Sequence, residues 1–137
     1  MAEEQLRIAA GTVLSVLSQT KQQLELSASY EAGGTAPPAH LHPVQDERFE
    51  VLAGAMRVRV AGQERELAAG EVLEIPRGTA HQMWNGSEEP GRMSWVTSPA
   101  GRTLEWLREL AALRAGEPLS DPETLLARYE DVFRLAG

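Results

Sequence analysis

The chain contains no cysteine and a single lysine, Lys21, and these shortages exclude several kinds of chemistry. Without cysteine there can be no disulfide framework, no thiolate nucleophile and no zinc–thiolate site. Any metal ion must therefore be held by histidine and carboxylate side chains. Schiff-base chemistry would have to use Lys21, which lies among polar residues (QTKQQ) that predict a turn.

Long apolar segments and basic clusters are missing as well. No hydrophobic run approaches the roughly 20 residues that a membrane-spanning helix needs, so we expect no membrane association. The formal net charge of −7 repels a phosphate backbone, and we expect no nucleic-acid partner. The first residues, MAEEQLRIAAG, carry acid where a secretion signal carries basic charge, which favours a cytoplasmic protein.

The 137 residues suffice for one hydrophobic core, and their pattern changes once along the chain. Between about residues 12 and 98, short segments alternate apolar and polar residues and are separated by glycine and proline, as in antiparallel strands. From Arg102 onward the apolar spacing is helical. We predict an all-β sandwich or barrel over residues 1–101, followed by a C-terminal helical extension over residues 102–137.

Individual strands follow from the same alternation. Residues 24–31 have one apolar and one polar face and predict a strand. Residues 47–60 repeat this pattern on both sides of Gly54-Ala55, which favours a hairpin. Residues 75–78 (IPRG) suit a type I turn. Further short strands are expected at residues 64–68, 72–75, 81–85 and 93–97.

In the extension, apolar residues recur with helical spacing in two stretches. The first ends near Gly116 and Pro118. Its apolar residues are Leu104, Trp106, Leu107, Leu110, Ala111 and Leu113. The second begins at SDPE, where Ser120 and Glu123 fit a capping box and Asp121-Pro122 offers an alternative start. Its apolar stripe consists of Leu125, Tyr129, Val132 and Phe133. We expect both helices to pack on the barrel or on a second subunit, without a chemical role.

The segment HLHPVQDE contains candidate metal ligands. On a strand, positions two apart point the same way, so His40 and His42 would present both imidazoles to one face. Glu47 opens the next strand in phase with Phe49, which places its carboxylate on the apolar face. A divalent cation held with the two histidines would satisfy this buried charge, although an isolated H-x-H also suits ordinary hydrogen-bonded histidines. The remaining histidine, His81, follows the IPRG turn.

These positions resemble the two sequence motifs of the cupin family. The first motif is a glycine, five residues, H-x-H, three or four residues, a glutamate, six residues and a glycine. This chain matches it with Gly34, His40, His42, Glu47 and Gly54. The second motif is a glycine, five residues, P-x-G, two residues, a histidine, three residues and an asparagine. It is matched by Gly70, Pro76, Gly78, His81 and Asn85, after a short spacer like that of small single-domain bacterial members.

The resemblance implies a jelly-roll barrel that holds one divalent metal ion near its axis. The implied ligands are His40, His42, Glu47 and His81. The motif glycines and Pro76 would lie in turns, and Asn85 would have a structural role. Three imidazoles and one carboxylate would leave an octahedral ion two open positions for water, oxygen or a bidentate substrate. This ligand set suits Fe, Mn, Ni, Co, Cu or Zn and does not select one of them.

Other residues are candidates for a pocket around the ion. Tyr30 points inward in its predicted strand and can donate a proton, although an inward tyrosine is more often a packing residue. The candidates for lining a pocket are Phe49, Met83, Trp84, Trp95 and Gln45. Each of them also has an ordinary explanation in core packing, subunit packing or turn formation.

Three functions remain open at this point. The first is a metal-dependent enzyme of dioxygenase or isomerase type that acts on a small organic molecule. The second is a protein that uses the same metal to bind such a molecule without converting it. The third is a metal-free barrel that serves interaction. We also expect a homodimer, because sheet edges and an apolar tail need cover and members of the family usually pair.

Overall fold

The structure, a computed structural model, describes residues 4–116 and 121–136. Its strands are β1 (Gln5–Ala9), β2 (Thr12–Gln19), β3 (Leu24–Tyr30), β4 (His40–Leu41), β5 (Asp46–Ala53), β6 (Ala55–Val60), β7 (Gln63–Ala68), β8 (Val72–Ile75), β9 (His81–Trp84), β10 (Gly91–Ser98) and β11 (Arg134–Leu135). The helices are α1 (Thr103–Arg114) and α2 (Pro122–Arg128). Within these residues, no helix is long and apolar enough to cross a membrane.

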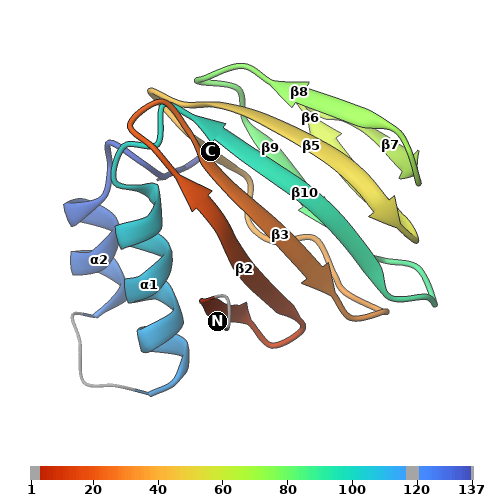
Figure 1. Cartoon of the computed structure of the whole chain (residues 1–137), viewed down its shortest axis with the longest axis horizontal. Coiled ribbons are helices and arrows are strands. Elements are labelled where there is room, and N and C mark those ends of the chain that lie inside the picture. Colours follow the sequence, from red (N-terminus) through yellow and green to blue (C-terminus); the bar gives the residue numbers. More distant parts are fainter. Residues whose placement is uncertain (1–3, 117–120, 137) are drawn as a thin grey trace.

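The strands form two antiparallel sheets that face each other as in a jelly roll (Figure 1). Sheet A has the order β1-β2-β3-β10-β5-β8, and sheet B has the order β11-β4-β9-β6-β7. The predicted all-β fold with a C-terminal helical region is therefore confirmed. The alternation in the sequence also predicts the places of β3, β7, β8, β9 and β10, whereas β1, β2 and β11 were not among the individual strands predicted.

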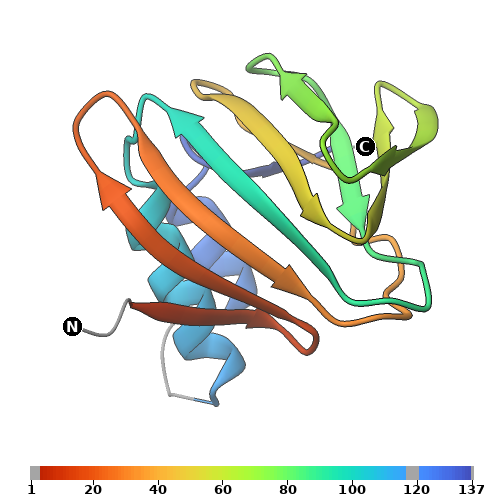
Figure 2. The same cartoon turned by 45° about the vertical axis from the view of Figure 1, so that its right-hand side comes forward.

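The inner face of sheet A is covered by two different partners. Near β5, β8 and β10 it packs on sheet B through Phe49, Val51, Met56, Val58, Leu67, Leu73, Ile75 and Met93. Near β1, β2 and β3 it packs on the helices, which lie behind these strands in Figure 2. This second cluster contains Leu6, Leu14, Leu24, Leu26, Ala28, Ala100, Leu104, Trp106, Leu107, Leu125, Tyr129 and Val132. Tyr30 and Trp95 contact both clusters and mark the border between them.

The predicted hairpin across Gly54-Ala55 is wrong. β5 pairs with β10 and β8, whereas β6 pairs with β7 and β9, so the two strands belong to different sheets. Gly54 has a φ of 75°, and a Cβ there would lie 2.5 Å from the carbonyl oxygen of Pro90. The chain thus turns a tight corner that only glycine fits. The apolar residues on both sides of this corner face the same core from opposite sheets.

The turn of the second motif is displaced by one residue from the prediction. The backbone N–H of Thr79 donates to the carbonyl oxygen of Pro76 at 3.3 Å, and Gly78 has a φ of 78°. A positive φ at the third position is typical of a type II turn, so the predicted type I turn over residues 75–78 is wrong. The N–H of Gly78 also donates to the carbonyl oxygen of His42 at 2.8 Å, which joins the two motifs.

The two predicted helices are present. α1 contains the expected apolar residues, and α2 begins with Asp121 as its N-cap, whose side chain accepts from the N–H of Thr124 at 2.9 Å. Pro122 occupies the first helical position, where its missing N–H costs nothing. The start at Asp121-Pro122 is therefore confirmed, while Ser120 of the alternative capping box lies outside the described residues.

Beyond α2 the chain leaves the helical path. Tyr129 is the C-cap, and the N–H groups of Val132 and Phe133 both donate to its carbonyl oxygen, at 2.8 and 2.9 Å. β11 then pairs with β4 and so joins sheet B. The prediction that Val132 and Phe133 continue a helical stripe is therefore wrong. We call residues 129–136 the C-terminal strap.

Candidate metal centre

The three histidines converge between the two sheets. His40 lies in β4, His42 follows this strand directly, and His81 begins β9, so all three belong to the side of sheet B. The ladder between β4 and β9 places His40 opposite His81. The ring centroids of the three histidines are 4.4 to 5.3 Å apart, and one nitrogen atom of each lies within 4.8 Å of the others. The predicted convergence is confirmed.

Glu47 approaches the histidines from β5 in sheet A. Its side chain is buried, and Oε1 lies 3.1 Å from Nε2 of His42 and 3.2 Å from Nε2 of His81. Although Oε1 is fully buried, it accepts no directional hydrogen bond from any residue in the described part of the chain. The other oxygen, Oε2, accepts a hydrogen bond from the indole N–H of Trp95 at 2.7 Å. The carboxylate is therefore fixed from one side and faces two imidazole nitrogens on the other.

Each histidine has its Nδ1 atom next to a backbone carbonyl oxygen. These distances are 2.7 Å from His42 to Val132, 2.9 Å from His81 to Thr79 and 3.4 Å from His40 to Pro38. A carbonyl oxygen only accepts, so Nδ1 carries the proton in each case. The Nε2 atom of a neutral imidazole is then left with a free lone pair. These are the atoms that His42 and His81 turn towards Glu47.

Two imidazole lone pairs and a carboxylate oxygen repel one another unless a positive charge lies among them. Either a proton on an imidazole or a metal cation supplies that charge. Neighbouring donor atoms on an octahedral ion with bonds of about 2.1 Å are about 3 Å apart. The two contacts of Glu47 Oε1, at 3.1 and 3.2 Å, agree with this spacing. The residues present therefore fit a divalent metal ion.

The protonation equilibria of the cluster are shifted by burial and by mutual charge. Burial, together with the neighbouring histidines, lowers the pKa of His40 to about 4. Burial also acts to lower the pKa of His42, but the close contact and charge of Glu47 outweigh it and raise this pKa. For Glu47, burial opposes ionisation, but His42 and His81 lower the pKa to about 2. Near neutral pH, Glu47 is thus anionic and His40 neutral, as metal ligands require.

Phe49 and Trp95 lie beside the carboxylate on the inner face of sheet A. They are opposite each other in β5 and β10, and their rings stack with centroids 5.9 Å apart at an angle of 20°. Phe49 is buried in the core between the sheets, and Trp95 bridges the two clusters while it donates to Glu47. Trp95 therefore contacts a candidate ligand directly, a hydrogen bond that the sequence did not indicate.

Tyr30 and Met83 also lie on the inner side. Tyr30 in β3 packs against both core clusters, and burial together with the charge of Glu47 raises the pKa of its hydroxyl. It therefore stays protonated near neutral pH and can donate a hydrogen bond. Met83 shares the inner face of β9 with His81 and packs on the core between the sheets.

Of the two remaining predicted pocket residues, Trp84 lies elsewhere. Trp84 follows the inward-facing Met83 and points to the outer face of sheet B, where the guanidinium of Arg59 lies 5.5 Å from its ring centroid. The prediction that Trp84 lines the pocket is therefore wrong. Gln45 is buried. Its side chain lies next to the connection between β10 and α1, where a Cβ added to Gly101 would be only 2.6 Å from its Nε2.

The C-terminal strap contributes two contacts that sequence reasoning missed. The ring of Phe133 stacks on His40, with centroids 4.7 Å apart at 20°, and meets His42 edge-on at 6.1 Å. The carbonyl oxygen of Val132 accepts from His42, as described above. Apolar residues with helical spacing do not indicate a contact with the histidines. A backbone carbonyl leaves no trace in the sequence at all.

A jelly-roll barrel with three histidines and a glutamate facing its interior belongs to the class of small β-proteins with a candidate metal centre. Residues 27–97, more than half of the chain, match the family described as "Cupin domain", and the chain belongs to this family. The solved structure of KdgF from Halomonas sp. has a TM-score of 0.67 and 21% identity, covering 74% of this chain and 90% of that one. This similarity shows the fold alone.

Two relatives are similar to part of the chain. The oxidoreductase iacF from Pestalotiopsis fici is 46% identical over 54 residues, which are 39% of this chain and 26% of that protein. The tetracenomycin polyketide synthase protein TcmJ from Streptomyces glaucescens is 34% identical over 68 residues, which are 50% of this chain and 46% of that protein. The matches thus span less than half the length of either relative.

Proposed function

We propose that this chain is a mononuclear metal-binding cupin that binds and converts a small organic molecule at the ion. The proposed ligands are His40, His42, Glu47 and His81. The observation that carries the proposal is the buried Oε1 of Glu47, which faces two imidazole nitrogens and has no directional hydrogen bond within the described residues. A divalent cation at this point would replace repulsion by attraction.

When bound, a divalent ion in such a shell supplies Lewis-acid chemistry towards oxygen donors. Three neutral imidazoles and one carboxylate leave about one net positive charge, which favours anionic oxygen donors such as an enolate, a phenolate or a carboxylate. The aromatic side chains of Phe49, Trp95 and Phe133 lie next to the ligands and favour a flat, conjugated molecule. Tyr30 can donate a hydrogen bond near Glu47, because its raised pKa keeps the hydroxyl protonated.

The names of the two relatives support an oxygen-rich substrate. One is called an oxidoreductase, and the other is called a polyketide synthase protein. Polyketide-derived rings carry neighbouring carbonyl, enol and phenol oxygens, which suit chelation at two adjacent open positions. We therefore propose an oxidation or an isomerisation of an aromatic or polyketide-type enol or phenol.

The first test is element-resolved metal analysis of freshly purified protein. We expect about one divalent ion per chain in the wild type and a loss of most of it in His40→Ala. A wild type without stoichiometric metal, whose stability hardly changes on His40→Ala or His81→Ala, would instead be the metal-free interaction barrel. The analysis also identifies the element among Fe, Mn, Ni, Co, Cu and Zn.

The second test is turnover of a panel of phenols, enols and polyketide-type rings. Oxygen uptake or a rearranged product is expected in the wild type and should be absent in His42→Ala. Metal-loaded protein that binds panel members without oxygen uptake or product would be a binding protein rather than an enzyme.

We further propose a homodimer. β8 is an edge strand of sheet A, and the apolar side chains of Val72 in β8 and Leu52 in β5 are both 41% exposed. An edge of this kind favours pairing with a second copy. A monomer mass in solution at micromolar concentration would contradict this proposal. The cytoplasmic location stays a prediction.

A further inference from the structure

The C-terminal strap forms a second layer around the histidines of the proposed metal centre. The carbonyl oxygen of Val132 lies 2.7 Å from Nδ1 of His42, and the ring of Phe133 stacks on His40. The N–H of Ala136 donates to the carbonyl oxygen of Ala39, directly before His40, at 2.8 Å. Two of the four proposed ligands thus take their orientation in part from this segment.

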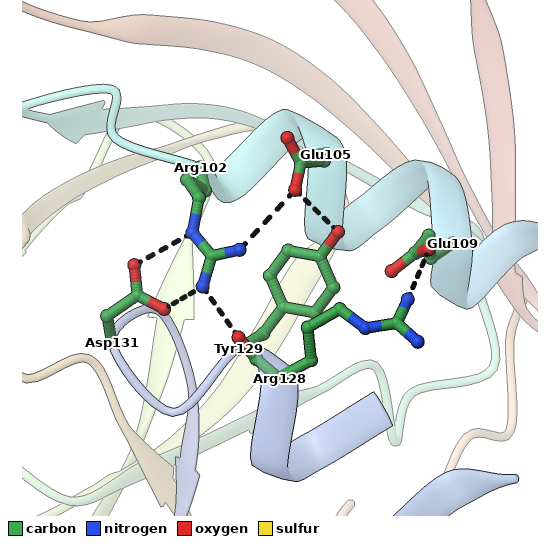
Figure 3. Close-up of polar contacts among 6 residues, drawn as sticks. All are labelled: Arg102, Glu105, Glu109, Arg128, Tyr129 and Asp131. Carbon is green, nitrogen blue, oxygen red and sulfur yellow. Dashed lines mark hydrogen bonds and ion pairs between the residues drawn. The ribbon is translucent and has the colours of Figure 1, made fainter. Parts of the chain in front are cut away.

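Arg102 contacts the first residues of the strap (Figure 3). Its guanidinium forms a bidentate ion pair with the carboxylate of Asp131. Nε donates to Oδ2 at 3.1 Å, and Nη2 donates to Oδ1. The same group donates to the carbonyl oxygen of Arg128 at 2.6 Å and lies 4.6 Å from the ring centroid of Tyr129. The hydroxyl of Tyr129 in turn donates to Glu105 in α1 at 2.7 Å.

The position of Arg102 links the barrel to the strap. It is the N-cap residue of α1 and follows β10 after a short connection, so its backbone is fixed by the barrel and by the helix. Its side chain reaches Asp131, the residue immediately before Val132. Because neighbouring Cα atoms are only about 3.8 Å apart, fixing Asp131 restricts where the carbonyl of Val132 and the ring of Phe133 can lie.

We propose that Arg102 and Asp131 are positioning residues of the metal centre. By holding the strap, they keep the carbonyl of Val132 on His42 and the ring of Phe133 on His40. His42 then keeps its proton on Nδ1 and presents Nε2 to the ion. The effect on metal affinity rests on the proposed function, whereas the effect on the histidine tautomer does not. Partners that orient a ligand typically change metal affinity by about 10- to 100-fold.

A purely structural role for Arg102 is the competing explanation, and α1 offers a matched control. Arg108 on the same helix forms a bidentate ion pair with Glu4, with hydrogen bonds of 2.8 and 2.7 Å. This pair lies next to β1 and does not involve the strap. The arginine side chains of the two pairs are similarly exposed, 41% for Arg102 and 54% for Arg108. Loss of either exposed ion pair alone, as in Asp131→Asn or Glu4→Gln, should therefore affect folding to a similar, small extent.

The first experiment measures Co²⁺ affinity near neutral pH for the metal-stripped full chain. Arg102→Ala should weaken Co²⁺ binding by about tenfold, and Arg108→Ala should stay within about twofold of the wild type. Arg102→Lys keeps the positive charge but lacks the planar guanidinium, so its Co²⁺ affinity should lie between those of Arg102→Ala and the wild type. Equal affinity of Arg102→Ala and wild type would overturn the inference. A wild type that binds no Co²⁺ would overturn the proposed function instead.

The second experiment needs no metal. Nitrogen-15 NMR of the histidines in the metal-free protein reports whether Nδ1 of His42 carries a proton and whether that proton is hydrogen-bonded. We expect the Nδ1–H signal of His42 in the wild type and Arg108→Ala, and its loss or exchange broadening in Arg102→Ala. An unchanged signal in Arg102→Ala would overturn the inference. If Arg102→Ala does not fold, Asp131→Asn removes the same ion pair at constant size, with the same expected results.

Discussion

The proposed ligands are supported from two sides, the barrel and the C-terminal strap, which the chain builds in different ways. On the barrel side, the indole of Trp95 fixes Glu47 and the carbonyl of Thr79 fixes His81. Trp95 comes from the middle of β10, and Thr79 belongs to the turn that precedes β9. Trp95 also packs on the core between the sheets.

On the strap side, the carbonyl that fixes His42 comes from Val132, 90 residues later in the chain. The strap is held by the ladder between β11 and β4 and by the buried side chains of Tyr129 and Val132. It is also tied to α1 by the ion pair of Arg102 and Asp131, whose side chains are 41% and 50% exposed. The proposed ligands therefore all lie in the two motifs, whereas part of their orientation depends on a segment that is remote in the sequence. Because an exposed ion pair contributes little and Phe133 adds a single aromatic contact to His40, we expect the strap to be the weaker of the two supports.

The largest effect is expected from Glu47→Gln on the barrel side. The amide has nearly the same shape but no negative charge, so metal affinity should fall by more than about 100-fold. The metal-free variant should be less stable than the metal-free wild type by at most about 3–5 kcal/mol in unfolding free energy, because the anion is removed while its buried partners His42 and His81 stay in place. Thermal unfolding with and without Co²⁺ measures both quantities. Retention of metal by Glu47→Gln would mean that the three histidines suffice.

The next effect is expected from Trp95→Phe. Oε2 of Glu47 would lose its donor, which should weaken metal binding by about 10- to 100-fold and destabilise the metal-free protein by about 1–3 kcal/mol. Trp84→Phe is the matched control, because this ring lies on the outer face under Arg59 and contributes less than about 1 kcal/mol. Co²⁺ titration and chemical unfolding measure the two variants. Equal losses of Co²⁺ affinity in Trp95→Phe and Trp84→Phe would contradict the assignment of Trp95 to the inner face and Trp84 to the outer face.

The barrel side was largely predictable because its signals are local. Strand alternation put Glu47 on the apolar face, and the spacing of the two motifs brought His40, His42 and His81 together. Alternation does not say which strand pairs with which, so it predicts a hairpin where β5 and β6 belong to different sheets. The corner at Gly54 depends on the carbonyl of Pro90, which is remote in the sequence.

The strap side could not be predicted from the same rules. Leu125 and Tyr129 are spaced as on a helix, and Val132 and Phe133 continue that spacing by position although the helix ends at Arg128. The contribution of Val132 is its backbone carbonyl, which any residue type would supply. Only the three-dimensional path of the chain shows that this carbonyl meets His42.

A smaller effect is expected from Phe133→Leu in the strap. Leucine keeps apolar cover but loses the stacked contact with His40, which for aromatic pairs is worth about 0.5–1.5 kcal/mol. Metal affinity should therefore fall by about 2- to 10-fold, less than for Trp95→Phe. Leu135→Ala in the same strap is the control, because its side chain is 55% exposed and should not change affinity. If Phe133→Leu weakens Co²⁺ binding more than Trp95→Phe does, the strap is the stronger support and the comparison is reversed.

The smallest effect concerns the pH dependence of the ion pair that holds the strap. Arg102 lowers the pKa of Asp131 below its ordinary value of 3.8, so the ion pair stabilises the fold above pH 3.8, and this stabilisation is lost as the pH falls through the lowered pKa. The wild type should therefore unfold at a slightly higher temperature than Asp131→Asn at neutral pH, with a difference in free energy below about 1 kcal/mol. The difference in unfolding temperature between the two proteins should become smaller only in strong acid. Glu4→Gln is the control, since Arg108 also lowers the pKa of Glu4 and the same narrowing is expected. Only Asp131→Asn should also lose the Nδ1–H signal of His42 at neutral pH. If Glu4→Gln loses this signal as well, any weakening of the contacts of α1 disturbs the site.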